Sequence, residues 1–534
     1  MKTLDKPPGV TTHTSLNADE HKRLWVDPID GYIEHLQYRS SLTLLPVHRL
    51  DVGTSGVFLV AETSEEASTL SLSFESRVFE KTYYFISDRK PRRGFASGNK
   101  IESHITRMKT GGSKATQYAS FSPTPQEPIN AVTTIEHVCD HGHFSLWRAK
   151  PETGKPHQIR LHAESVGLAI LGDDEHGGTK FPSLCLHAAE IKSDSVSATS
   201  PLPRWFNNLE LLMRPQLIRW LQAFERRERL YRSLQIVNVS RPETLRWIHT
   251  DGGPLRLDQL GDVYQLHWYG DSLTAANQAD IELLLQMLGV HSWYLQHRGN
   301  RGREPNKEVT QLSTPTLPER WTATEEAIHF NFRRDSGLSP GLFLDCRANR
   351  RLLSRLRPDT VLNLFSYTGG FSVAAALAGA KHVVTVDISR KFLDWAKENF
   401  RANSLDPEKP CYEFREIESQ VYLKWATKNG LLFDAVICDP PSFARLEKSV
   451  FRLEVELEAL LKQCLGVTAP GGFVLFSTNH EGLTAELLIK RIDALLKSTW
   501  LPFRIERAPS PDWDFELPRE PRLNKSLVLR RAYS

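Results

Sequence analysis

The sequence lacks the features that hold a protein in a membrane or outside the cell. Its 534 residues include only six cysteines, and no two of them form a C-x-x-C pair. Such scattered thiols suit a reducing compartment better than a disulfide framework or a zinc site. No apolar run approaches the ~20 residues of a membrane span, and the first residues are not patterned as a signal peptide. We therefore expect a cytoplasmic protein with no membrane partner and no bound metal.

An excess of charge of one sign is also lacking. Lysine and arginine number 67 against 64 acids, for a net charge of +3. Affinity for nucleic acid would therefore depend on local patches and not on overall charge. The contents of hydrophobic and charged residues, 40% and 25%, are ordinary for globular proteins. Because the chain is too long for one ordinary core, we expect two to four domains.

One carboxylate in the first half stands in an unusual place. Asp51 lies between the basic pair 48–49 and a Thr-Ser-Gly turn at 54–56, directly before the apolar run 57–61. Taken alone, Asp51 could be a loop residue that caps a turn. Three further blocks favour a functional role: Asp5–Val10, the strand-like Glu80–Phe85 with Tyr83, and Thr153–His162, a glycine turn that leads to Arg160.

These four blocks, in this order, resemble the RluA-type pseudouridine synthases over roughly the first 195 residues. The resemblance implies a mixed α/β domain with a mostly antiparallel sheet, an RNA substrate and no cofactor. It implies that Asp51 acts beside the sugar of a flipped-out uridine, while Arg160 pairs with it and fixes its orientation. Tyr83 would stack on the uracil and could take a proton. The structural alternatives are a plain ion pair for Arg160 and a core aromatic for Tyr83, and His48 and His157 are expected to be structural hydrogen bonders.

The middle of the chain predicts a boundary and a small module. Residues 193–203 are rich in Ser, Thr and Pro, so we place the end of the first domain at 195 and a linker with a helix at 196–232. That helix region holds seven arginines between 204 and 232, which indicate either a solvated face or an RNA-steering patch. A small α/β module is predicted for 233–330. Two basic segments, 90–114 and 297–303, could be solvated or could contact phosphates.

Residues 331–534 form the last predicted domain, which has the pattern of a doubly wound sheet. A buried strand at 360–365 leads into a tight turn with Gly369 and Gly370, and a second strand ends in Asp387. The glycines let the backbone approach a ligand, and the carboxylate can hold both hydroxyls of a ribose. Because the turn is not a G-x-G-x-x-G, a dinucleotide fits poorly, whereas S-adenosylmethionine fits well.

A buried strand at 433–438 runs into Asp439-Pro-Pro-Ser-Phe443, which resembles the target-base motif of class I RNA and DNA methyltransferases. From about Leu245 the chain resembles the RlmI/RlmK-type methyltransferases of large-subunit ribosomal RNA, through 343–350, 361–372 and 439–443. The resemblance implies a Rossmann-like class I domain with Asp439 as a catalytic residue. Glu418 stands where the family commonly has Asp. The residues implied at the cofactor are Phe365, Tyr367, Thr368, Gly369, Gly370, Asp387, Ile388, Glu418 and Asp439, and those implied at the target base are Pro440, Pro441 and Phe443.

The cysteine positions indicate which atom is methylated. Methylation of cytosine at carbon 5 needs a thiolate that adds to the ring. Ser442 stands where one class of such enzymes has its cysteine, and the loop 476–480 lacks the other. Cys438 faces away from Asp439 if both lie on one strand, so we expect a core thiol there. We expect a guanine nitrogen as the target and keep 5-methylcytosine as the alternative.

Taken together, the sequence predicts a multidomain α/β enzyme with two catalytic heads, a pseudouridine synthase and an S-adenosylmethionine-dependent methyltransferase. The expected partner is RNA, as 23S ribosomal RNA or a pre-ribosomal particle. Two alternatives stay open: only one head is active and the other binds RNA, or the protein is a non-catalytic ribosome-assembly factor. The sequence identifies neither the modified nucleotides nor the oligomeric state.

Overall fold

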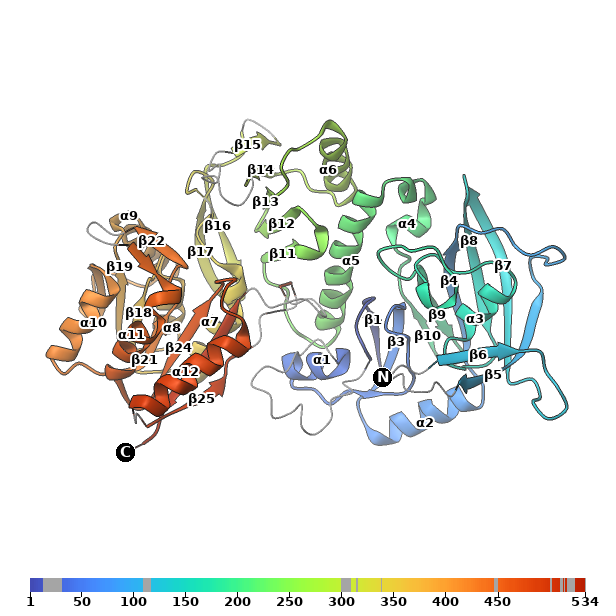
Figure 1. Ribbon diagram of the computed structural model, residues 1–534, viewed down its shortest axis with the longest axis horizontal. Coiled ribbons are helices and arrows are strands. Elements are labelled where there is room, and N and C mark those ends of the chain that lie inside the picture. The colour runs from blue at the N-terminus through green and yellow to red at the C-terminus, as the bar shows by residue number, and fades with distance from the viewer. Residues whose placement is uncertain are drawn as a thin grey trace.

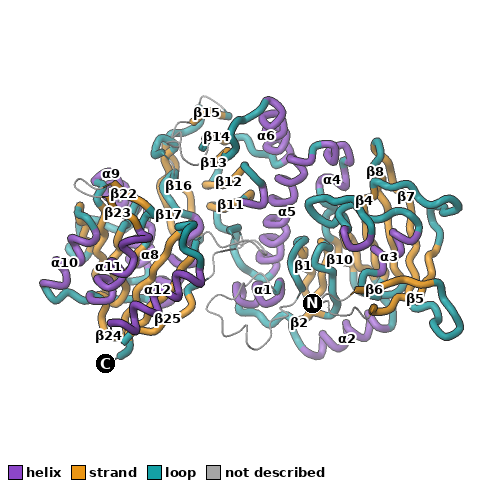
Figure 2. The backbone as a smooth tube through the Cα atoms, viewed as in Figure 1, coloured by secondary structure: helices purple, strands orange, loops and turns teal. Residues whose placement is uncertain are grey.

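The computed structural model describes residues 1–12, 31–108, 117–298, 309–313, 316–337, 339–445, 450–499, 502–509, 512, 514–515 and 524–533. It is elongated, with a strand-rich domain at one end, a layered α/β domain at the other, and a long helix with a small sheet between them (Figure 1). Figure 2 shows strands dominating the first domain, whereas helices flank the strands of the last. The predicted multidomain α/β fold is confirmed.

The first domain is built on a ten-stranded sheet with the order β1-β3-β9-β4-β8-β7-β5-β6, in which β2 pairs with β3 and β10 with β9. Its described pairs are antiparallel except β3 with β9, as expected for a mostly antiparallel sheet. The helices are α1 (Tyr32–Ser40), α2 (Ser64–Glu75) and α3 (Gln158–Ser165). The strands are β1 (Lys2–Lys6), β2 (Leu45–Pro46), β3 (Ser55–Ala61), β4 (Glu80–Ser87), β5 (Lys100–Met108), β6 (Gln117–Phe121), β7 (Ala131–His141), β8 (Phe144–Pro151), β9 (Leu186–Lys192) and β10 (Ser197–Thr199).

The Ser/Thr/Pro-rich segment is not the linker that its composition predicted. Within it, β10 pairs antiparallel with β9, and Ala198 and Ser200 are buried. Small polar side chains fit a short edge strand because they alternate between the sheet face and solvent. The first domain therefore extends to about residue 200. Of the basic segment 90–114, residues 109–114 lie outside the described part of the chain.

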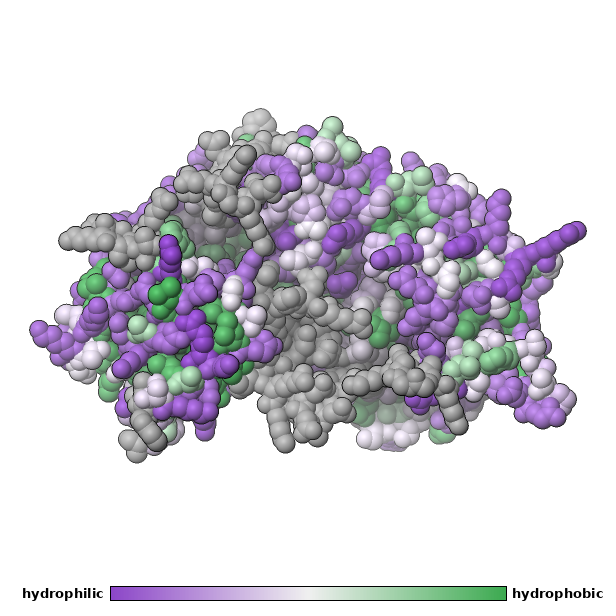
Figure 3. Space-filling model, viewed as in Figure 1, coloured by the Kyte–Doolittle hydropathy of each residue, from purple (hydrophilic) through white to green (hydrophobic). Residues whose placement is uncertain are grey.

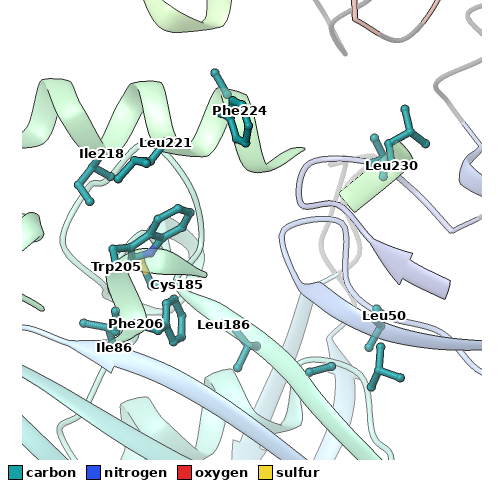
Figure 4. Close-up of a cluster of buried hydrophobic side chains, with 14 of the residues drawn as sticks. Leu50, Ile86, Cys185, Leu186, Trp205, Phe206, Ile218, Leu221, Phe224 and Leu230 are labelled. Carbon is teal, nitrogen blue, oxygen red and sulfur yellow. The ribbon is translucent and has the colours of Figure 1, made fainter. Parts of the chain in front are cut away.

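Helix α5 (Pro215–Ile236) joins the first domain to the middle module, preceded by the short α4 (Arg204–Asn207). One hydrophobic core runs from the first domain through α5 into the module. Figure 4 shows Ile218 and Leu221 of α5 facing Trp205, with Cys185 beyond it. The first domain and the middle module share this hydrophobic core, so α5 packs against both and holds them together.

Most arginines of this region are paired with acids of the two flanking bodies, and only Arg214 and Arg219 are exposed, so they do not form the continuous solvated face or RNA-steering patch that their density indicated. Arg227 and Arg229 are buried, at 1% and 3% side-chain exposure. A helix held between two bodies must neutralise its cations with acids from both, since an unpaired buried charge is costly. The contacts are Arg204 with Glu225 and Glu228, Arg214 with Asp280, Arg219 with the carbonyl of Asp251, Arg226 and Arg227 with Asp251, and Arg229 and Arg232 with Asp5.

The middle module is a five-stranded sheet in the order β11-β12-β13-β14-β15, with α6 (Ala275–Met287) before β14. A separate hairpin, β16 (Arg320–Glu325) and β17 (Ile328–Arg333), leads to the last domain. Of the predicted basic loop 297–303, residues 299–303 lie outside the described part of the chain. The strands of the sheet are β11 (Thr244–Ile248), β12 (Leu255–Leu260), β13 (Val263–Trp268), β14 (Trp293–His297) and β15 (Val309–Leu312).

The last domain has a seven-stranded sheet in the order β20-β19-β18-β21-β24-β26-β25. Its first five strands are parallel, as the doubly wound pattern predicted. We expected 526–530 to close the sheet as an edge, but β26 is internal because β25 pairs outside it. The elements are β18 (Thr360–Leu364), β19 (His382–Asp387), β20 (Tyr412–Glu416), β21 (Phe433–Cys438), β22 (Phe443–Arg445), β23 (Val450–Arg452), β24 (Thr468–Thr478), β25 (Phe503–Arg507), β26 (Lys525–Arg531), α7 (Arg347–Leu356), α8 (Gly370–Leu377), α9 (Arg390–Ala402), α10 (Ser419–Lys428), α11 (Leu453–Gly466) and α12 (Ala485–Thr499).

The surface is mostly hydrophilic on the face shown in Figure 3, with small apolar patches between charged side chains. Among the described helices, none has the length and apolar character needed to cross a bilayer.

Candidate active sites

The loop between β2 and β3 carries Asp51 at the edge of the first sheet. The carboxylate side chain is 30% exposed. Beneath the loop lies Lys6, whose buried ammonium donates to the carbonyls of Asp51, Val52 and Thr54 at 3.3, 3.3 and 2.9 Å. Burial lowers the pKa of Lys6 to about 7. A single buried amine therefore fixes the backbone on which Asp51 stands.

Arg160 of α3 lies beside Asp51, with its Nη1 at 3.8 Å from the Asp51 carboxylate. Its main partner is Asp173, which takes two hydrogen bonds from the guanidinium at 2.7 and 2.6 Å and is fully buried. Glu175 takes a third at 2.8 Å. The guanidinium of Arg160 is therefore held by Asp173 through two nitrogens, and its third nitrogen faces Asp51. Sequence reasoning missed Asp173, whose only signal was its position just after the apolar run 168–171.

Tyr83 lies half-buried on β4. Burial, and then the charge of Asp51, raise its pKa, which places the ring near that carboxylate. A phenol with a raised pKa stays protonated at neutral pH, so Tyr83 is suited to stacking or to donating a hydrogen bond. It is poorly suited to accepting a proton, which was one of the roles that we considered from the sequence.

The histidines near this site make hydrogen bonds. His48 Nε2 accepts from the backbone N–H of Leu59 at 2.9 Å, and burial lowers its pKa to about 3. His157 Nδ1 lies 2.9 Å from His176 Nε2. His157, Glu175 and His176 each offer one atom of a kind that binds metal ions, a ring nitrogen or a carboxylate oxygen, and these three atoms lie within 4.8 Å of one another. We assign no metal to this group, because Glu175 already pairs with Arg160 and the two rings bond to each other.

The last domain contains a cavity of about 340 Å³ at the carboxyl ends of β18, β19 and β21. Residues predicted from the sequence form much of its wall: Phe365, Tyr367, Asp387, Ile388, Glu418, Asp439, Pro440 and Pro441. Other lining residues were not foreseen: Phe343, Asp345, Cys346, Ser389, Phe392, Ser419, Gln420, Phe451, Asn479 and Asn524.

The glycine turn supports the cavity from behind. Thr368, Gly369 and Gly370 are not among its lining residues, contrary to our expectation. Gly369 has φ +73°, and a Cβ there would lie 2.7 Å from the Cβ of Ala396. Thr368 is buried and donates to the carbonyl of Gly341. The turn is therefore packed tightly against α9 and the segment before α7, and its shape sets the position of Tyr367.

The cavity wall suits a cationic nucleoside. Among the described residues that line it, Asp345, Asp387, Glu418 and Asp439 are carboxylates and none is Lys, Arg or His. Asp387 accepts from the backbone N–H groups of Tyr367 and Ser389, both at 2.9 Å, so its oxygens are held in place. Fixed carboxylates attract a sulfonium and repel a pyrophosphate. This set of carboxylate acceptors therefore fits S-adenosylmethionine, which carries a positive charge and ribose hydroxyl donors.

Asp439 and Cys346 meet on one side of the cavity, with Sγ 3.7 Å from Oδ2. Burial, and then the charge of Asp345, raise the pKa of Asp439 to about 7. Burial also raises the pKa of Cys346 well above its ordinary value, so this unforeseen thiol stays protonated. Cys438 is fully buried. Phe443, predicted at the target base, is 52% exposed and not among the lining residues.

Comparisons with known proteins assign both halves. Residues 2–165 match the model of RNA pseudouridylate synthases, and residues 286–517 match that of S-adenosylmethionine-dependent methyltransferases. Ribosomal RNA large subunit methyltransferase K/L of Shewanella pealeana is 37% identical over 198 residues, 35% of this chain and 26% of the relative. Its namesake in Chromohalobacter salexigens is 29% identical over 358 residues, 64% of this chain and 44% of the relative.

A similar fold occurs in the crystal structure of SMU.776, a putative methyltransferase complexed with SAH, with a TM-score of 0.51 and 24% identity; the match covers 59% of this chain and 81% of that one. The chain spans less than half the length of the curated relatives cited above. The two family matches do not overlap; the second begins at the end of α6 in the middle module, and residues 166–285 and 518–534 lie outside both. The chain thus combines a region that matches the RNA pseudouridylate synthases with a region that matches the S-adenosylmethionine-dependent methyltransferases.

Proposed function

We propose that the protein is a bifunctional RNA-modifying enzyme that converts a uridine to pseudouridine and methylates a base from S-adenosylmethionine. The observation that supports this proposal is that each of the two domains brings its candidate reactive side chains together in one place. Asp51 lies beside the anchored Arg160 in one domain, and Asp439 lies in an acidic nucleoside-sized cavity in the other. A protein that merely gripped RNA would need neither set.

The first site suits the rearrangement of uridine. A pseudouridine synthase breaks the bond between N1 of uracil and the sugar, turns the base, and joins its carbon 5 to the same sugar carbon; carbon 5 then loses its proton and N1 gains one, so the product is an isomer of the substrate. Asp51 attacks the sugar or stabilises the charge that develops on it, while Arg160 holds the carboxylate in place. Tyr83 stacks on the base. The uridine must leave its stack to reach Asp51, at a cost of roughly a few kcal/mol.

The second site suits methylation of a guanine nitrogen. When bound, S-adenosylmethionine supplies an electrophilic methyl group. Asp387 and Glu418 hold the nucleoside part, and Asp439 accepts a hydrogen bond from the base edge, which aligns the nucleophile. Guanine offers N–H donors at N1 and N2 to such an acceptor-rich wall. Because the thiol of Cys346 stays protonated, this geometry does not favour the covalent addition that 5-methylcytosine formation requires.

The substrate that we propose is RNA of the large ribosomal subunit, within the cytoplasm. The names of the curated relatives support this choice, since they describe large-subunit ribosomal RNA methyltransferases. The pseudouridine synthase half has no comparable indication of its own, so we assign it the same RNA because both heads lie on one chain.

The test uses Asp51→Ala and Asp439→Ala in a strain that lacks the gene. Mass spectrometry of ribosomal RNA should show that each variant loses one modification and keeps the other. Loss of both modifications with either variant, or of neither, would contradict two independent heads. Calorimetric titration of the wild-type protein with S-adenosylmethionine tests the non-catalytic alternative, which predicts no binding.

A further inference from the structure

A second polar cluster lies in the middle module, outside both active sites. Arg246 of β11 grips Asp258 of β12 with two hydrogen bonds of 2.6 and 2.7 Å. Arg256, also on β12, lies close enough to Arg246 for the two charges to interact. His267 of β13 accepts a hydrogen bond of 2.9 Å from the Nε of Arg298. Arg246 and Arg256 from two neighbouring strands, together with Arg298 just after β14, thus lie near one another around the buried Asp258.

Arg256 forms no ion pair with a carboxylate of the described chain, although Asp251 and Asp258 act on it from a greater distance. Its guanidinium donates to the carbonyls of Gly253 and Leu255, and no acid of the described chain lies within ion-pair distance of it. Burial, and then the charge of Arg246, lower the pKa of Arg256 to about 10, so it remains protonated at neutral pH. A half-buried cation of this kind is ready to bind an anion.

An exposed aromatic ring accompanies this cation. Tyr269 is 49% exposed, and the guanidinium of Arg256 lies 5.1 Å from the centre of its ring. Cationic groups that track the backbone, combined with aromatic rings on which bases stack, are the usual means of binding single-stranded RNA. An inorganic anion would need the charge but would have no use for the ring.

The cluster adjoins the methyltransferase cavity. Although burial lowers the pKa of Arg246, the carboxylates of Asp258 and Asp345 raise it above its ordinary value. Asp345 is part of the cavity wall, so Arg246 lies within its electrostatic reach. Phe515 of the last domain also packs on Arg246, 4.9 Å from the guanidinium carbon to the ring centre. The acidic wall would repel a phosphate, whereas the arginines just outside it would attract one.

We propose that Arg256 binds a backbone phosphate of the RNA next to the nucleotide that is methylated, and that Tyr269 stacks on a flanking base. Arg246 supports the site by holding the neighbouring strand through Asp258. This inference rests on the proposed RNA-methylating function, and it names the surface by which the middle module takes part in it. Phosphate contacts of this kind position the substrate and carry no sequence information.

The experiment measures binding of a fluorescein-labelled single-stranded RNA of mixed sequence by anisotropy, over a series of salt concentrations. Arg256→Met keeps the packing of the side-chain stem and removes the charge. It should weaken binding several-fold and reduce the slope of log K against log salt by about 0.7. Arg256→Lys keeps the charge and should retain the wild-type slope. Tyr269→Leu should weaken binding by at least about fivefold and leave the slope unchanged.

Arg241→Met is the matched control. Arg241 is an exposed arginine of the same module that stacks on Trp247, outside the cluster. If Arg241→Met reduces the slope of log K against log salt as much as Arg256→Met does, the proposed site is wrong, because RNA affinity would then depend on the general charge of the module. An unchanged slope in Arg256→Met would also overturn it. Absence of RNA binding by the wild-type protein would contradict the proposed function itself, whereas S-adenosylmethionine affinity should be the same in all variants.

Discussion

The buried ammonium group of Lys6 lies 3.3 Å from the backbone carbonyl oxygen of Asp51. It also donates to the backbone carbonyls of Val52 and Thr54, so the end of β1 supports the loop that carries Asp51. Lys6→Met removes these donors and keeps the volume. We expect pseudouridine formation to fall by about 100-fold, since a small displacement of a reacting group costs this much. The measurement is single-turnover kinetics on RNA.

Lys2→Met is the control, because Lys2 lies on the same strand and its ion pair with Glu62 is peripheral.

The buried amine of Lys6 also predicts that the stability of the protein depends on pH. Its pKa is about 7 in the folded protein against 10.5 for the ordinary side chain, so the unfolded state binds more protons between these values. Its contribution to the free energy of unfolding therefore rises from pH 7 to 10.5. If Lys6→Met has the same pH dependence as the wild type, the buried amine is not responsible.

Asp173 should matter to pseudouridine formation even though it does not face the substrate. Asp173→Asn removes the buried charge that orients Arg160, and we expect a lower kcat with a smaller change in KM. Glu175→Gln is the matched control, since Glu175 pairs with the same guanidinium but is 66% exposed. Screening by solvent should make its effect small. Equal effects of the two variants on kcat would show that burial of the partner is irrelevant.

Methyl transfer should depend on pH through Asp439. The pKa of this carboxyl is about 7, so kcat/KM for S-adenosylmethionine should rise with pH and level off above 7. Asp439→Asn should have a low and flat profile. The free energy of unfolding should change in the opposite direction. Because the pKa of Asp439 in the folded protein lies above the ordinary 3.8, its carboxyl contributes fully to the free energy of unfolding below pH 3.8, and this contribution is lost as the pH rises through 7. A wild-type profile without an inflection near 7 would remove Asp439 from this role.

Asp512 ties the two catalytic domains together. Its carboxylate meets Arg39 of α1 at 2.7 Å, and Arg347 and Arg351 of α7 at 3.1 and 2.9 Å. Asp512→Asn leaves three partly or fully buried guanidinium groups short of a partner, at a cost of about 3 kcal/mol. Hydrogen exchange of backbone amides in α1 and α7 should then be faster by roughly a hundredfold.

The control for this contact is Lys381→Met. Lys381 pairs with Asp359 on the surface, with side chains 75% and 56% exposed, so its loss should cost less than about 1 kcal/mol. Unchanged exchange in α1 after Asp512→Asn would mean that the domains are held by apolar contacts alone. The same result would remove any reason to expect one domain to influence the other.

Short motifs allowed the sequence to indicate both catalytic centres. Asp51, the turn at Gly369 and the Asp439-Pro-Pro block are local arrangements, in which neighbouring residues decide the backbone and the reactive group together. The families that they indicated and the two α/β sheets agree with the structure and the comparisons, and several residues predicted at the cofactor line the cavity of the last domain. The roles of individual site residues remain predictions.

Only the tertiary structure decided which charges meet. The arginines of α5 read as a surface patch because their partners, Asp5 and Asp251, lie far away in the sequence. Asp173 behind Arg160 and Cys346 beside Asp439 were hidden for the same reason. Whether a charged side chain is solvated, paired or free to bind a ligand depends on what packs against it, and long-range packing leaves no periodic trace in the residues themselves.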